Sequence, residues 1–301
     1  MTTLQKTARL LAALSASLFY ACCLPPGHAQ QTPVVPAPAV SPVQADPHAA
    51  SEESKVIRKH RMKKLEEHLN IDAEVLHHQC RYESEISDAP PEKKLVLSFD
   101  DGPEPGQTEY ILSVLKKHHI PATFFMIGEK VQAHPELLAL VQESELALIG
   151  NHSWTHPNFH DVPVTEQKSE VDKTAALLEK TVSEQYFRYP YGNSSCETNE
   201  LLKSRGYKIV GWHVDTCDWA FDHKGSVDTK EALSCGVLAQ NRENFFEHVL
   251  SSVRAHNGGI ILMHEIHPNT LKQLDALVTR LLADGYTFEK LSDPAFARSL
   301  R

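Results

Sequence analysis

Basic tracts and long apolar runs are both missing from most of this sequence. The formal net charge is −9, and no run of lysine and arginine is long enough to indicate a nucleic-acid-binding surface. After residue 29, no segment approaches the roughly 20 apolar residues that a membrane-spanning helix requires. With 41% hydrophobic and 23% charged residues, the composition also excludes collagen-like, coiled-coil and wholly disordered proteins. We expect a globular protein with no nucleic-acid partner and no stable membrane span.

The first 29 residues are typical of a secretory signal peptide. Lys6 and Arg9 give a positive beginning, residues 10–24 form a short apolar run, and small residues end at Ala29, where a signal peptidase would cut. This pattern predicts an exported protein, either periplasmic or secreted.

A lipoprotein is the alternative interpretation of the same segment. Cys22 or Cys23 would then carry the lipid, but Phe19 and Tyr20 are poor residues just upstream of a lipidated cysteine. We therefore favour export without a lipid anchor.

Four cysteines remain after residue 29, and none has the Cys-x-x-Cys spacing of a zinc site. An even number of cysteines in an exported protein favours disulfide bonds. Three pairings are possible, and the sequence does not choose between them. We favour Cys217–Cys235, which would staple a loop, and assign Cys80–Cys196 by elimination.

The chain divides into four parts. Behind the signal peptide of residues 1–29, residues 30–50 form a linker that contains five prolines and no lysine, arginine or aromatic residue. Residues 51–90 are charged with a narrow apolar stripe, which predicts a short N-terminal helical extension. The main domain is expected over residues 91–301.

Strand-like and helix-like segments alternate along this main domain. The strand-like segments are residues 95–99, 122–127, 146–150, 186–189, 207–213, 259–264 and 286–291. They are short and apolar without clean alternation, as parallel strands covered on both faces are. The pattern predicts an α/β fold, a distorted, seven-stranded (β/α) barrel; an open doubly wound sheet is the alternative.

Chemically useful side chains follow the ends of these strands. In βα architectures the carboxyl ends of the strands meet on one face, where active sites form. The side chains expected to meet there are Asp100, Asp101, His152, His156, Arg188, Asp215, Asp218 and His264.

His152 and His156 are four residues apart, a spacing that binds zinc when it lies on a helix. Here Ser153 replaces the glutamate of that helical motif and Pro157 disfavours a helix, so we expect a loop that presents two ligands. By itself the pair is a weak signal, but Asp101 at a neighbouring strand end would complete it. Two histidines and one carboxylate leave positions open for water and substrate, which is the catalytic pattern.

Five motifs occur in order along the domain: LSFDDGP, HSWTHP, RYPYG, DTCDW and ILMH. Together they resemble the polysaccharide deacetylases, the NodB-homology enzymes of carbohydrate esterase family 4, over roughly residues 93–291. The resemblance implies that Asp100 is the general base that activates water. It also implies that Asp101, His152 and His156 hold a divalent metal ion, for which we expect zinc.

The same resemblance assigns roles to the RYPYG motif. Arg188 would lie against Asp100 and keep that base ionised and oriented. The backbone N–H of Tyr191 would help to hold the oxyanion formed during hydrolysis.

The last two motifs would supply the proton for the leaving group. His264 would be the general acid, with Asp218 favoured over Asp215 as the carboxylate that supports its pKa. Trp219 and Leu262 would wall the pocket for the acetyl group.

Two departures from the family pattern stand out. Glu265 follows His264 where the family more often has aspartate, which we treat as minor. The connection from Trp219 to His264 is longer than usual, and its residues 221–240 carry Cys235 and little helical pattern. We hypothesise that a Cys217–Cys235 bridge orders this segment as part of a groove rim that selects a particular polymer.

The function expected from the sequence is a secreted, metal-dependent N-deacetylase that acts on N-acetylglucosamine units of a polysaccharide, with peptidoglycan first. A chitin-oligosaccharide deacetylase and a polysaccharide O-acetyl esterase are the alternatives. A catalytically silent carbohydrate-binding relative is disfavoured, because none of the proposed base, acid or ligand residues is substituted.

Overall fold

The structure is a computed structural model that describes residues 82–84, 86, 88–178 and 184–301. The predicted signal peptide, the Pro-rich linker and residues 51–81 of the predicted helical extension lie outside these residues, so those assignments stay predictions. Within the described part of the chain, no helix combines the length and the apolar character needed to cross a membrane.

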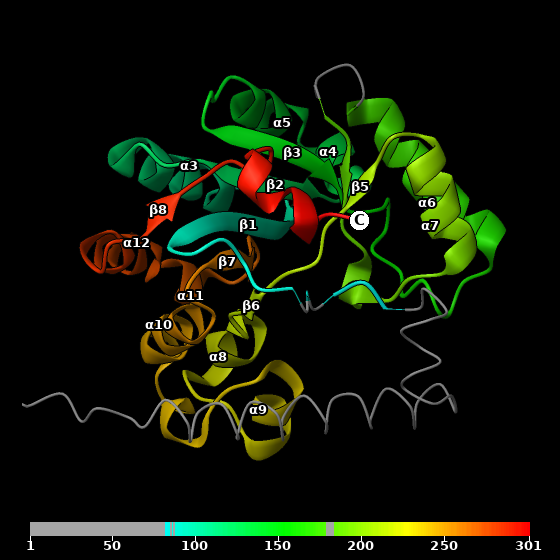
Figure 1. The fold of residues 1–301 in the computed structure, drawn as a ribbon. Helices are drawn as coiled ribbons and strands as arrows, with labels where there is room; N and C mark the ends of the chain where they lie inside the picture. The colour runs from blue at the N-terminus through cyan, green and yellow to red at the C-terminus, as the bar shows by residue number, and fades with distance from the viewer. Residues whose placement is uncertain (1–81, 85, 87, 179–183) are drawn as a thin grey trace, which may run out of the picture. The chain divides into compact units, whose positions relative to one another are not determined.

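One parallel sheet organises the described residues (Figure 1). Its strands are β1 (Lys94–Gly102), β2 (Ala122–Met126), β3 (Ala147–Asn151), β4 (Tyr186–Phe187), β5 (Lys208–Ile209), β6 (Val214–Asp215), β7 (Gly259–His264) and β8 (Thr287–Phe288). Seven of them lie in the order β5-β4-β3-β2-β1-β7-β6, and β8 pairs with the beginning of β1. The prediction of a distorted (β/α) barrel is confirmed, in a form that is curled and incomplete.

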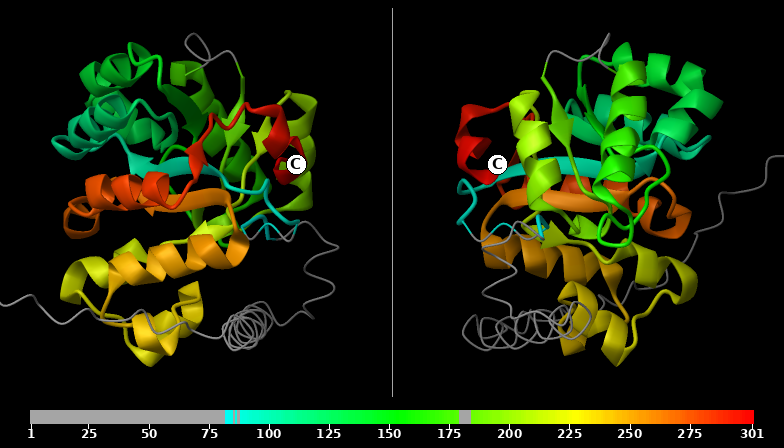
Figure 2. Two further views of the ribbon diagram at one scale, coloured as in Figure 1. Left: turned by 60° about the vertical axis from the view of Figure 1, so that its left-hand side comes forward. Right: turned by 90° about the vertical axis from the view of Figure 1, so that its right-hand side faces the viewer.

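Helices cover the outside of the curled sheet, as Figures 1 and 2 show. The longer ones are α3 (Gln107–His118), α5 (Pro135–Gln142), α6 (Val164–Leu178), α7 (Cys196–Ser204), α10 (Phe245–His256) and α12 (Leu274–Ala283). The shorter ones are α4 (Gly128–Ala133), α8 (Asp218–Lys224), α9 (Thr229–Cys235) and α11 (Pro268–Leu271). Because helices pack on the strands, the central strands are buried along nearly their whole length and read as continuous apolar runs.

One predicted strand is wrong in detail. Residues 207–213 form β5 only at Lys208–Ile209, and the next strand, β6, begins at Val214 on the other end of the strand order. The residues between them lead from one end of the strand order to the other, and the carbonyl oxygens of Val210 and Gly211 accept hydrogen bonds from Arg188. The sequence pattern could not show this, because the crossing segment is as apolar and buried as a strand.

The sheet register brings the two most central strand ends together. Asp100 of β1 is the direct neighbour of His264 of β7, and Phe125 of β2 flanks Asp100 on the other side. All strand pairs in the sheet are parallel, so their carboxyl ends lie on one edge of the sheet. The predicted site residues therefore start from one face of the barrel.

Candidate active site

The end of β1 presents two adjacent carboxylates to the same place. On a regular strand, successive side chains point to opposite faces. Here the register with β2 shifts between Asp100 and Gly102, and Asp101 takes a left-handed backbone conformation with φ of 68°. Aspartate tolerates this conformation better than most residues. As a result, Asp100 Oδ2 and Asp101 Oδ1 both lie 3.5 Å from Nε2 of His152.

The loop after β3 carries the two histidines, and it is a loop rather than a helix, as the sequence predicts. Glu170 of α6 holds it: its carboxylate accepts hydrogen bonds from the backbone N–H groups of Trp154 and Thr155 at 2.8 and 2.7 Å. His152 is oriented separately, because its Nδ1 lies 2.8 Å from the carbonyl oxygen of Arg188. A carbonyl only accepts, so Nδ1 carries the proton and Nε2 presents a lone pair.

Asp101, His152 and His156 form a set of donor atoms that fits a metal ion. Their ligand atoms lie within 4.8 Å of one another, and Asp101 Oδ1 is 3.3 Å from Nε2 of His156. Among the described residues, this buried oxygen has no hydrogen-bond partner. Two imidazoles and a carboxylate are ligands that zinc accepts, with room left for further ligands. An orphaned buried oxygen that faces two imidazole nitrogens is what a metal site requires.

The ionisation states suit the same purpose. Burial opposes the charge on Asp101, but the facing histidines outweigh it and hold its pKa below the ordinary value. Burial, reinforced by the neighbouring His152, lowers the pKa of His156 to about 4. Near neutral pH the site therefore offers an anionic carboxylate and a neutral imidazole, the forms that bind a metal.

Arg188 is fully buried and oriented by four acceptors. One terminal nitrogen (Nη1) donates to Asp100 Oδ1 at 2.7 Å and to Ser98 Oγ at 2.8 Å. The rest of the guanidinium donates to the carbonyl oxygens of Val210 and Gly211, in the segment that connects β5 to β6. Arg188 thereby holds the Asp100 carboxylate in place, and Asp100 is the partner that a buried cation requires.

His264 pairs with Asp218. Asp218 Oδ1 lies 2.8 Å from His264 Nδ1, and Oδ2 accepts the backbone N–H of His264 at 2.6 Å. Burial disfavours the imidazolium, but the adjacent Asp218 carboxylate outweighs it and raises the pKa of His264 to about 10. Asp215, the other candidate, has its Oδ1 on the backbone N–H of Cys217 instead.

The remaining predicted residues lie around this centre. Tyr191 has a left-handed backbone with φ of 59°, and its ring packs edge-on against His156 with centroids 4.8 Å apart. Within the described residues its backbone N–H makes no hydrogen bond. Trp219 follows Asp218 and is partly exposed, whereas Leu262 is buried on β7 two residues before His264.

Sequence reasoning missed Glu170 and treated Glu265 as a minor departure. Glu170 gave no signal, because a glutamate within a helix is ordinarily a surface residue. Glu265 is fully buried and accepts a hydrogen bond from Thr108, and burial raises its pKa to about 8. A Cβ atom on residue 102 would lie only 1.7 Å from the other carboxylate oxygen, Oε1 of Glu265. Glu265 thus packs directly beneath the turn that carries Asp101, and Gly102 is the residue that leaves it room.

The long connection after Trp219 is more helical than expected. It forms α8 and α9, and Cys217 is bonded to Cys235 with Cα atoms 5.6 Å apart, the pairing that we favoured. The other predicted pair, Cys80–Cys196, stays a prediction because Cys80 lies outside the described residues.

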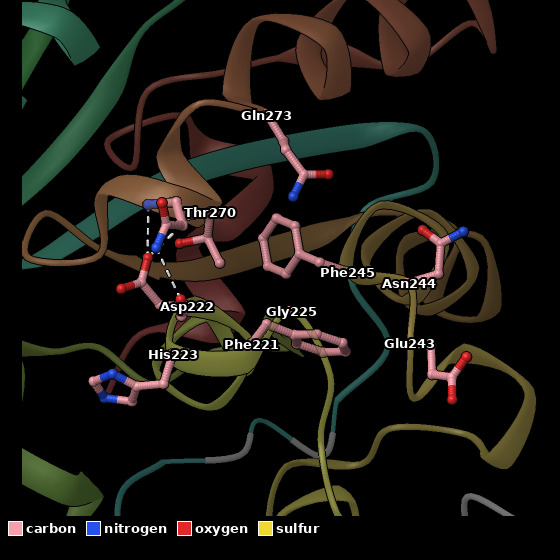
Figure 3. Close-up of a pocket in the computed structure, with 10 residues that line it drawn as sticks. Phe221, Asp222, His223, Gly225, Glu243, Asn244, Phe245, Thr270 and Gln273 are labelled. Atoms are coloured by element: carbon pink, nitrogen blue, oxygen red, sulfur yellow. Dashed lines mark hydrogen bonds between the residues drawn. The ribbon is translucent and has the colours of Figure 1, made fainter.

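A cavity of about 370 Å³ opens beside α8 (Figure 3). Phe221 and Phe245 line it, with ring centroids 5.6 Å apart. Asp222 lies on one side of them and Glu243 on the other. Asp222 of α8 accepts a hydrogen bond from the backbone N–H of Asn269 at 2.6 Å, which links α8 to α11.

Comparison with known proteins places the chain among relatives with the same fold. The polysaccharide deacetylase family profile matches residues 87–210. The chain is 34% identical over 215 residues to the peptidoglycan-N-acetylglucosamine deacetylase PgdA of Listeria monocytogenes. That match covers 69% of this chain and 40% of PgdA, so the chain spans less than half of that relative.

In two further comparisons the match covers most of the related protein. The chain is 30% identical over 213 residues to the peptidoglycan-N-acetylmuramic acid deacetylase PdaA of Bacillus subtilis (strain 168), covering 70% of this chain and 74% of PdaA. A crystal structure of the peptidoglycan N-acetylglucosamine deacetylase Bc1960 superposes with a TM-score of 0.57 at 27% identity, over 70% of this chain and 91% of that one. Shared motifs, fold and sequence thus agree: the chain belongs to the polysaccharide deacetylases of carbohydrate esterase family 4.

Proposed function

We propose that this protein is an exported, metal-dependent N-deacetylase that removes acetyl groups from N-acetylglucosamine units of peptidoglycan. The observation that carries the proposal is the meeting, at one sheet edge, of an arginine-bound carboxylate, a His-His-Asp donor set and a histidine paired with a buried aspartate. The names of the relatives support peptidoglycan as the polymer. Export rests on the pattern of residues 1–29.

Asp100 is the base in this mechanism. Its Oδ1 is bound to Arg188, while Oδ2 faces the donor set and is free to take a proton from an attacking water. Because Arg188 has no exposed surface and cannot move toward solvent, Asp100 keeps its orientation through the reaction.

Asp101, His152 and His156 would hold the metal ion, which when bound supplies a Lewis acid that lowers the pKa of water and polarises the acetyl carbonyl. The N–H of Tyr191 then stabilises the negative charge that develops on the carbonyl oxygen. Its left-handed backbone turns this N–H out of the local hydrogen-bonding pattern, which leaves it available to the substrate. One such donor typically contributes about 10²–10³ in rate.

His264 completes the reaction by giving a proton to the departing amine. Asp218 Oδ1 accepts a hydrogen bond from Nδ1 and stabilises the imidazolium, so Nε2 is the nitrogen that can give its proton to the amine. The backbone bonds from His264 and Trp219 fix the Asp218 carboxylate. An amine is a poor leaving group unless protonated, so an N-deacetylase needs this residue.

Acetate release by the purified protein tests the proposal. Peptidoglycan, N-acetylglucosamine oligomers and acetylated xylan would be compared with and without a chelator. We expect chelator-sensitive release that is fastest from peptidoglycan. Preferential release from xylan would identify an O-acetyl esterase, and preferential release from the oligomers a chitin-oligosaccharide deacetylase. Binding without any release would identify a silent carbohydrate-binding relative.

Replacing His264 by alanine separates the amide and ester reactions. We expect His264→Ala to slow N-acetyl hydrolysis by about 10²–10⁴-fold, the usual contribution of a general acid. Hydrolysis of an activated acetate ester, whose leaving group needs no proton, should fall far less. Acetate release from both substrates gives the comparison, and equal losses would argue against the acid role. The metal ion held by Asp101, His152 and His156 should be retained, because His264 is not one of its proposed ligands.

The disulfide-linked connection is expected to influence polymer choice. Cys235→Ser opens the bridge while leaving Cys217, the neighbour of Asp218, in place. We expect the ratio of rates on peptidoglycan and on short oligomers to change by about 10-fold, the selectivity that one altered pocket contact supplies. Ser234→Ala, a change on the same helix that leaves the bridge intact, is the control. An unchanged ratio in Cys235→Ser would refute the hypothesis that the bridge orders a selective rim.

A further inference from the structure

A second group of side chains that could hold a metal ion starts from the neighbouring strand end, where His264 is the register partner of Asp100. The potential ligand atoms of Asp218, His264 and His267 are within 4.8 Å of one another. His264 ends β7, Asp218 begins α8, and His267 lies immediately before α11. The proposed reaction uses Asp218 and His264 and leaves His267 without a task.

The side chains of this group are arranged like the ligands of a zinc site. A proton lies between His264 Nδ1 and Asp218 Oδ1, where the metal ion would be. The 2.8 Å between His264 Nδ1 and Asp218 Oδ1 approaches the separation of about 3.3 Å between two ligand atoms of a tetrahedral zinc ion. The rings of His264 and His267 meet edge-on with centroids 5.6 Å apart. The donor atom of His267 lies within 4.8 Å of those of Asp218 and His264.

His267 is free to act as the third ligand. In the described part of the chain, neither of its ring nitrogens has a hydrogen-bond partner; only its backbone carbonyl is used, by Thr270 and Leu271. Burial lowers the pKa of His267. The side chain of His264 is 18% exposed, so the group borders solvent on that side.

We propose that Asp218, His264 and His267 form a second, inhibitory zinc site. Zinc takes the place of the proton between His264 and Asp218, and that proton leaves to solvent. Because this proton must be displaced, the second site binds zinc more weakly than Asp101, His152 and His156 do. Occupation removes the imidazolium that protonates the leaving amine, so excess zinc stops the reaction. The inhibition rests on the function proposed above, whereas the binding does not.

Zinc counting tests the site without reference to activity. The full-length protein is dialysed against increasing free zinc, and bound metal is measured by elemental analysis. We expect one tight and one weaker zinc per chain. His267→Gln should keep the tight zinc, which shows that it is folded, and lose affinity for the weaker one by at least about 10-fold, since losing even an outer partner of a metal ligand costs 10–100-fold. His223→Gln, which removes an exposed histidine of α8, should bind two zinc ions like the parent.

Activity measured over the same zinc range tests the consequence. Acetate release should fall as the second zinc binds, and His267→Gln should need at least about 10-fold more zinc for half inhibition while its rate at low zinc is unchanged. A single bound zinc at all concentrations, or a second zinc that His267→Gln still binds equally well, would overturn the proposed site. A second zinc that binds through His267 without slowing the reaction would overturn its inhibitory role.

Discussion

Asp101→Ala is expected to lose the bound metal and to slow acetate release by more than about 10⁴-fold. This loss exceeds the 10²–10⁴ that a single acid or base group supplies, because the activated water and the polarised carbonyl disappear together. Asp101 Oδ1 lies 3.5 Å from Nε2 of His152 and 3.3 Å from Nε2 of His156. Among the described residues, no other carboxylate oxygen pairs with both histidines. Elemental analysis and acetate release on the same preparation measure the two effects.

Asp101→Asn is the matched control for backbone strain. Position 101 has a left-handed backbone, which asparagine adopts as readily as aspartate and alanine does not. The asparagine variant should therefore keep the stability of the parent in thermal unfolding and still bind the metal at least about 10-fold more weakly. Full metal affinity and full activity in Asp101→Asn would contradict the assignment of Asp101 as the anionic ligand.

Asp100→Asn is expected to retain the metal and to reduce turnover by about 10²–10⁴-fold, the contribution of a general base. An amide oxygen can still accept the hydrogen bond from Arg188 but takes no proton from water at neutral pH. The loss should appear as a lower rate at saturating substrate, with little change in KM. Single-turnover acetate release would measure it directly.

Ser98→Ala is the control for this second variant. Ser98 Oγ is another acceptor of the Arg188 guanidinium, so its removal disturbs the arginine without removing the base. We expect its rate to stay within about 10-fold of the parent. If Asp100→Asn lost the metal and Asp101→Asn kept it, the roles of the two aspartates would be the reverse of those proposed.

The meeting of the site residues was predictable because it depends on topology alone. Apolar segments that alternate with helical patterns indicate parallel strands, and parallel strands end on the same side. Asp100, His152, Arg188 and His264 all lie at or directly after such ends. The pairing of His264 with Asp218 rather than Asp215 could only be decided from the structure. The two aspartates are three residues apart, but Asp215 ends β6 and binds the backbone N–H of Cys217, whereas Asp218 begins α8 and binds His264.

Irregular backbone was beyond the reach of sequence patterns. The crossing after β5 looks like a strand in sequence because its residues are equally apolar, and only its place between the two ends of the strand order shows otherwise. The helices α8 and α9 were missed because each is only seven residues long, too short for helical periodicity to appear. The Cys217–Cys235 bridge that ends α9, by contrast, is the pairing that the sequence analysis favoured.

The sequence by itself determined the fold class, the family and the chemical types of the site residues, because periodicity and motif order are local properties of the chain. The tertiary structure decided how those residues face one another. The register shift that turns Asp101 toward His152, and the carboxylate of Glu170 that holds the histidine loop, come from segments far apart in the chain. Their effect depends on packing at the edge of the sheet, where a shift of one residue redirects a side chain from one face to the other.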